Sequence, residues 1–139
     1  MKALGSIALG FGLLFVTAVA NAQAVYVKAN IPFDFVAGNQ ALPAGQYRIS
    51  PAPGVLVIRS ADGTKSAMST TQNWGGGGRL ERTELIFHHI GKTYFLSQVK
   101  VEGFSEGRQL PKSRTESEAE VAANQKPEQV VIVAGVVNK

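Results

Sequence analysis

The sequence predicts an all-β domain, mainly antiparallel, folded as a β-sandwich or a partly closed barrel with one short helix in its C-terminal half. Two observations lead to this fold class. After residue 24, short runs of aliphatic, β-branched and aromatic residues alternate with Gly, Pro, Asn and Asp, which is the spacing of strands and turns. One segment near residue 120 is instead rich in Glu and Ala, which favour helix.

Residues 1–22 are predicted to be a secretory signal peptide. Lys2 gives the segment a positive start, and residues 3–20 are apolar apart from one Ser and one Thr, as in the hydrophobic core of an export signal. A retained transmembrane anchor is the alternative, since the run approaches the ~20 residues that cross a bilayer. Three glycines within the run and the cleavage site that follows it favour the signal peptide.

The predicted cleavage site has small residues at Ala20 and Ala22, which leaves Gln23 as the first mature residue. Cleavage after Ala24 is the alternative. We therefore expect residues 23–139 to be a single β-rich domain in the periplasm or the medium.

Composition restricts the partners of this domain. The chain has no Cys, which excludes both disulfides and the lipoprotein route, whose acyl anchor needs a Cys at the cut. Lys2 is the only charged residue of the signal, so its removal lowers the net charge from +4 to +3. A charge of this size does not indicate a nucleic-acid partner, and contact with the membrane is expected only through the export signal.

The first predicted strand covers residues 25–31, where apolar and polar residues alternate. Pro32 removes a backbone donor, so residues 33–36 should form an edge strand or begin after a bend. Residues 38–40 then turn the chain.

A meander of three strands follows. Pro43 and Gly45 mark the turn into a strand that begins near Gln46, and residues 51–54 end it. The next strand covers residues 55–59. After it comes the hairpin signal Asp62–Gly63, which leads into a polar strand over residues 65–71.

The glycine run at 75–78 predicts a flexible surface loop, because four glycines lose much backbone entropy on ordering. A phosphate-binding loop would need a Lys-Ser or Lys-Thr and then a helix. Arg79 and Leu80 follow here instead.

Two strongly β-prone runs, residues 83–90 and 92–101, predict a central hairpin that turns at Gly91. A helix is expected over about residues 113–124, with Ser113 as its N-cap and Glu116 at the capping-box position. Residues 129–137 predict a last strand that completes the sheet. The basic residues before the helix, Lys112 and Arg114, are expected to pair with Glu116, Glu118 or Glu120.

His88 and His89 are the only histidines of the chain. On a strand they point to opposite faces, so they cannot chelate one metal ion. The sequence therefore predicts no metal site, no catalytic residue and no cofactor. A hydrolase would need one of these rings within reach of a Ser or a carboxylate, and no nucleophile motif is present.

Trp74, Tyr94 and Arg59 are candidates for an aromatic contact surface, because Trp and Arg are favoured in interfaces. Such a surface would bind a sugar, a peptide or a partner protein. Ordinary packing of Trp74 is the competing interpretation.

The chain resembles a group of small exported proteins common in acidobacteria. The resembling segments are residues 31–35, 42–47, 87–96 and 107–114, spread over most of the mature chain. The resemblance implies a signal peptide followed by one mostly-β domain. It implies no activity, cofactor or catalytic residue.

These observations predict an exported, non-enzymatic binding or interaction module of the cell envelope or medium, with a protein, glycan or small molecule as its ligand. A small-molecule or lipid carrier with a cavity inside a barrel is the alternative. A hydrolase that uses His88 or His89 is the less favoured one. The sequence does not specify an oligomeric state.

Overall fold

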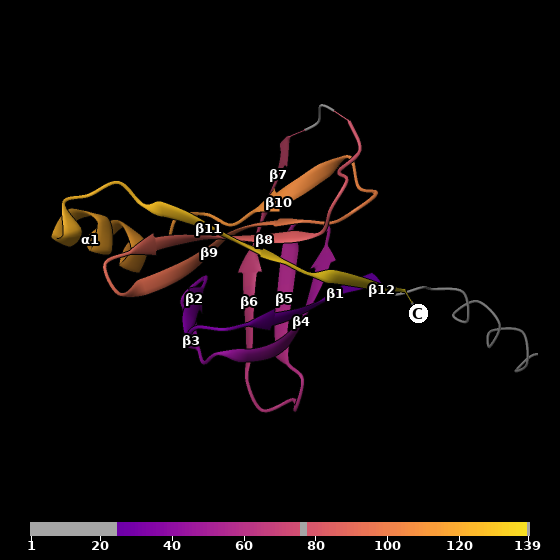
Figure 1. Ribbon diagram of the computed structural model, residues 1–139, viewed down its shortest axis with the longest axis horizontal. Coiled ribbons are helices and arrows are strands. Elements are labelled where there is room, and N and C mark those ends of the chain that lie inside the picture. Colours follow the sequence, from indigo (N-terminus) through magenta and orange to yellow (C-terminus); the bar gives the residue numbers. More distant parts are fainter. Residues whose placement is uncertain (1–24, 76–77, 139) are drawn as a thin grey trace, which may run out of the picture.

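The computed structural model describes residues 25–75 and 78–138 (Figure 1). The predicted signal peptide, with its cleavage positions at Ala20, Ala22 and Gln23, and the middle of the glycine run lie outside the described residues. Within them, two mainly antiparallel sheets and one helix confirm the all-β prediction. A search of this part of the chain found no helix with the length and apolar character needed to cross a membrane.

Five antiparallel strands form the first sheet, in the order β12-β1-β4-β5-β6. They are β1 (Val25–Ile31), β4 (Gly45–Ala52), β5 (Val55–Ser60), β6 (Ser66–Thr70) and β12 (Gly135–Asn138). Strand β4 runs one residue past Pro51, where we expected it to end. The pairing of β1 with β4 ends at Ile49, so the missing N–H of Pro51 costs no hydrogen bond to β1.

The turn between β5 and β6 is held by Asp62. Its Oδ1 accepts hydrogen bonds from the Ser60 hydroxyl at 2.7 Å, from the Thr64 hydroxyl at 2.8 Å and from the Thr64 amide at 3.0 Å. The hydrogen bond from Ser60, followed by those from Thr64, lowers the pKa of Asp62 from 3.8 to about 2.

The ionised Asp62 should therefore stabilise the folded protein above about pH 4, and this contribution should disappear as the pH falls towards 2, because the folded-state pKa lies below the unfolded one. We expect Asp62→Asn to remove this acid dependence. Urea unfolding at a series of pH values measures it. An identical slope in the variant and the parent between pH 4 and 2 would contradict the assignment.

The second sheet contains seven strands. The path β11-β8-β9-β10-β7 is antiparallel, and the hairpin β2–β3 joins it through a short parallel pairing of β2 with β9. The strands are β2 (Phe35–Ala37), β3 (Gln40–Leu42), β7 (Gln72–Gly75), β8 (Glu84–Ile90), β9 (Thr93–Lys100), β10 (Glu106–Gln109) and β11 (Glu128–Val133).

The two sheets pack with their strands running across one another, and Figure 1 shows β5 and β6 crossing β8 and β9. One residue, Thr71, separates β6 in the first sheet from β7 in the second, and Ala134 alone separates β11 from β12. At these two edges of the sandwich the chain therefore passes directly from one sheet into the other, as at the corners of orthogonal sandwiches. The last predicted strand, residues 129–137, is thus divided between both sheets and does not complete a single one.

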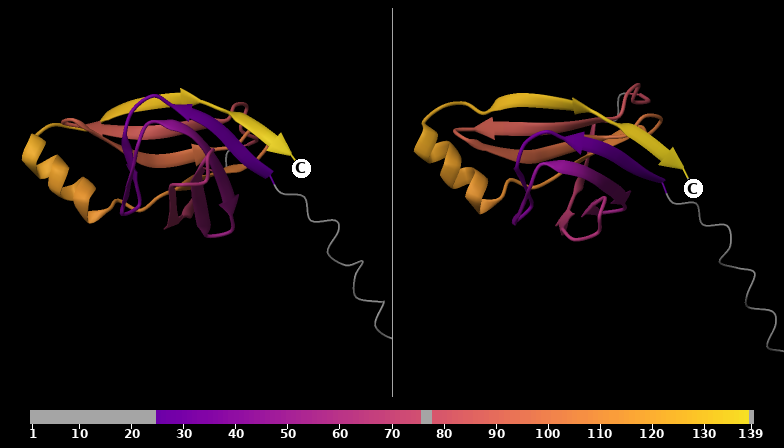
Figure 2. Two further views of the ribbon diagram at one scale, coloured as in Figure 1. Left: turned by 90° about the horizontal axis from the view of Figure 1, so that it is seen from below. Right: turned by 60° about the horizontal axis from the view of Figure 1, so that its bottom comes forward.

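The core fills the space between the sheets, which Figure 2 shows as stacked layers. Its largest fully buried side chains are Tyr47, Phe35, Phe87, Ile31, Ile49, Leu56, Ile58 and Leu85. Phe87 meets Phe33 and Phe35 edge to face, with ring centroids 5.0 and 5.6 Å apart. This geometry adds to the stabilisation that burial gives.

Helix α1 (Arg114–Ala123) lies within the predicted range and packs on β8. Ser113 is its N-cap and accepts a hydrogen bond from the Glu116 amide, and Asn124 ends it in the left-handed conformation. The predicted local pairs form: Lys112 contacts Glu120 at 2.9 Å and Arg114 contacts Glu118 at 3.0 Å. The hydrogen bond with Glu120 raises the pKa of the Lys112 amine.

Candidate functional site

The two histidines lie on opposite faces of β8, as the sequence predicted. His89 faces Tyr94 across the β8–β9 ladder, and the two rings stack 4.1 Å apart. Tyr94 in turn stacks on Phe33 at 3.8 Å. Glu128 Oε2 lies 4.0 Å from His89 Nδ1. The His89 ring therefore belongs to a row of four side chains: Glu128 on β11, His89 on β8, Tyr94 on β9 and Phe33 just before β2.

His88 binds the helix. Its Nδ1 lies 2.9 Å from Oε2 of Glu116, whose side chain is 6% exposed. Glu116 was predicted at the capping-box position, but its carboxylate contacts the His88 ring instead. In the described part of the chain neither imidazole hydrogen-bonds to a Ser or Thr hydroxyl, so the geometry supplies a carboxylate partner without a nucleophile.

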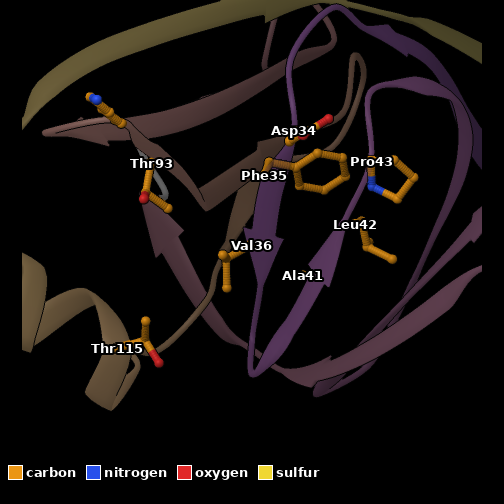
Figure 3. Close-up of a pocket in the computed structure, with 9 residues that line it drawn as sticks. Asp34, Phe35, Val36, Ala41, Leu42, Pro43, Thr93 and Thr115 are labelled. Carbon is orange, nitrogen blue, oxygen red and sulfur yellow. The ribbon is translucent and has the colours of Figure 1, made fainter.

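A surface groove of about 490 Å³ opens between the β2–β3 hairpin, the start of β9 and the start of α1 (Figure 3). Its lining is mostly apolar, with Asp34, Lys92, Thr93 and Thr115 as polar members. Figure 3 shows Thr115 facing Val36, while Asp34 lies at the far end of the groove. Asp34 already accepts a hydrogen bond from the Ala44 amide at 2.9 Å, which leaves few groups directed at a ligand.

The surface that we hypothesised from Trp74, Tyr94 and Arg59 does not form. Trp74 lies near Lys100 at the C-terminal end of β9, whereas Tyr94 lies near the N-terminal end of that strand. Arg59 belongs to β5 in the other sheet. The interpretation failed because Trp74 is part of a strand, β7, which the polar sequence beside the glycine run did not reveal.

Trp74 instead belongs to a row of side chains that crosses the second sheet. It pairs with Gly107 of β10, and the Lys100 ammonium lies 4.9 Å from the centre of its ring. A Cβ on Gly107 would come within 3.6 Å of the Trp74 ring and 3.4 Å of the Lys100 side chain. The row continues to Glu84, opposite Lys100, and ends at the exposed Val133.

A second, parallel row contains three glutamines. Gln72 faces Gln109, Gln109 faces Gln98, Gln98 faces Ile86, and Ile86 faces Val131. Leu85 and Val99 alternate with these residues along β8 and β9 and belong to the core. Side chains two residues apart on a strand share a face, so both rows lie on the opposite side, where Ile86 is itself 3% exposed. We call this surface the outer face, defined by Gln72, Trp74, Gln98, Lys100, Gln109, Val131 and Val133.

The outer face combines a half-exposed indole, neutral amides and two aliphatic side chains. Trp74 is 40% exposed, and Val131 and Val133 are 45% and 63% exposed. Glu84, whose side chain is 15% exposed, is already paired with Arg82 at 2.9 Å. Apart from Lys100 and the paired Glu84, its hydrogen-bonding groups are uncharged amides, each of which donates and accepts.

Within residues 25–75 and 78–138, no three acidic or histidine side chains gather as a metal site would need. Comparison with protein-family models, with curated proteins and with solved structures found no match to this chain.

Proposed function

We propose that the protein is an exported, non-enzymatic module that binds an extended polysaccharide chain on the outer face. The export part is supported by the apolar N-terminal run and its small-residue cleavage positions. The observation that supports the binding part most is the alignment of Trp74 beside a row of three glutamines.

The chemistry of this surface matches a chain of sugar rings. One side of a pyranose presents C–H groups, which pack on the indole of Trp74, and its hydroxyls donate to and accept from amide side chains. The glutamines follow one another on adjacent strands about 4.8 Å apart. A flat, extended chain laid across the strands would therefore meet one amide after another.

The experiment is a pull-down of the protein with insoluble polysaccharides such as cellulose, xylan, mannan and chitin. We expect Trp74→Ala to weaken retention on the bound polysaccharide at least about tenfold, since buried aromatic anchors dominate such interfaces. Met68→Ala is the matched control, because Met68 is 68% exposed but lies on β6 of the first sheet. Equal retention of the two variants would remove Trp74 from the site.

The groove lined by Asp34 and Thr115 supports a second candidate function, the binding of a small molecule. Its volume of about 490 Å³ lies within the range of ligand pockets. It is a surface feature, whereas core side chains occupy the space between the sheets. A ligand retained through purification and detected by native mass spectrometry would favour this candidate.

A further inference from the structure

Strand β7 is the end of the path β11-β8-β9-β10-β7 in the second sheet. One of its edges pairs with β10 over all four residues, Gln72–Gly75. Among the described residues no strand pairs with the other edge, and all four residues are exposed. The free edge therefore presents backbone donors and acceptors to solvent, which is a template for another strand.

The edge of β7 is short, which itself limits pairing, but it carries none of the side chains that usually prevent it. Natural edge strands carry Lys, Pro or a bulge that blocks a neighbour, but β7 contains only Gln72, Asn73, Trp74 and Gly75. Its pairing with β10 is regular. From this combination we infer that two copies of the chain pair through β7, antiparallel and edge to edge.

The sequence of β7 is compatible with itself in one register. With Asn73 opposite Asn73 of the second copy, Trp74 of each copy lies opposite Gln72 of the other. Residues opposite one another in an antiparallel ladder share a face, so the outer faces of both copies point to the same side. Strand β7 contains no charged residue, and the Arg108 guanidinium, one strand back, donates a hydrogen bond to Asn73 Oδ1 at 3.0 Å.

The pair is weak in solution, because only three residues of each β7, Gln72 to Trp74, face one another in this register and bury less than the ~1,200 Å² of stable interfaces. The net charge of +4 on each chain opposes it, so salt should strengthen it by screening. On a polymer the two copies are held at high effective concentration. Pairing then makes one continuous outer face with two Trp74 side chains. The inference that two copies pair goes beyond the proposed function and does not depend on it.

Sedimentation equilibrium of the protein alone, up to about 1 mM and at low and high salt, tests this inference without any polysaccharide. We expect a concentration-dependent rise in mass towards the dimer, larger at high salt. Asn73→Lys places two ammonium groups directly opposite one another on the pairing axis and should weaken association at least about tenfold. Gln40→Lys adds the same charge to an exposed position on β3 and should leave association unchanged.

A monomer mass at every concentration and both salt levels would overturn the inference. So would an equal effect of Asn73→Lys and Gln40→Lys, because association would then reflect net charge and not β7. Either result leaves the Trp74 retention experiment unaffected, so a failure of the pairing is distinguishable from a failure of polysaccharide binding.

Discussion

Replacing Phe87 by Ala is expected to lower the free energy of unfolding by about 3–5 kcal/mol. Phe87 is fully buried and touches Phe33 and Phe35, which flank Asp34 in the chain, edge to face. The variant loses the burial of the ring, its aromatic contacts and the packing that closes β2 onto β8. Since small domains are stable by about 5–15 kcal/mol, it should be marginally folded.

Urea unfolding followed by circular dichroism measures this loss. Met68→Ala serves again as the control, because an exposed side chain should change stability by less than about 0.5 kcal/mol. If Phe87→Ala costs under about 1 kcal/mol, the aromatic centre does not hold the two sheets together, and the packing described above is wrong.

The second large effect is expected at Glu116, where replacement by Ala should cost about 2 kcal/mol. Its carboxylate is nearly buried and its hydrogen bond to His88 has an ionised acceptor, a type worth roughly 1.5–3 kcal/mol. The His88 ring is 31% exposed, so it regains some water contacts in the variant, which keeps the loss in the lower half of that range.

Glu118→Ala is the matched control on the same helix. Glu118 pairs with Arg114 in solvent, with 65% of its side chain exposed, and such surface pairs contribute little. Denaturant unfolding gives the two losses, and hydrogen exchange of the helix amides shows whether the helix loosens first. Equal losses in the two variants would show that the contact with His88 does not fasten α1 to β8.

Much of the fold could be predicted because its signals are local. The alternation in residues 25–31 gives β1, Asp62–Gly63 gives the β5–β6 hairpin, and Ser113 gives the start of α1. Each of these features depends on residues within one turn or one strand. Their positions therefore follow from backbone preferences and from the period of apolar residues.

Strands β7 and β10 could not be predicted in this way. Gln72–Gly75 and Glu106–Gln109 carry neither an apolar period nor β-branched residues, and they become strands by pairing with each other and with β9. The division of the last strand at Ala134 is likewise a tertiary effect, because the bend follows the corner between the sheets.

The candidate site was missed for the same reason. Trp74 was recognised as a possible anchor, but Lys100 and Gln109 become its neighbours only through the pairing of β7 with β10. The contact between His88 and Glu116 joins residues that are 28 positions apart. No local pattern encodes either one, although an exposed Trp beside evenly placed glutamines is a signal once the ladder is known.

The most direct test of polysaccharide binding uses the fluorescence of Trp74, which is the only tryptophan of the chain. The protein would be titrated with soluble fragments of cellulose, xylan, mannan and chitin of increasing length, at a concentration where it is monomeric. A saturable shift in emission, with affinity that rises with chain length, is the predicted result. Unchanged emission with every fragment, from a protein shown to be folded, would contradict binding at the outer face.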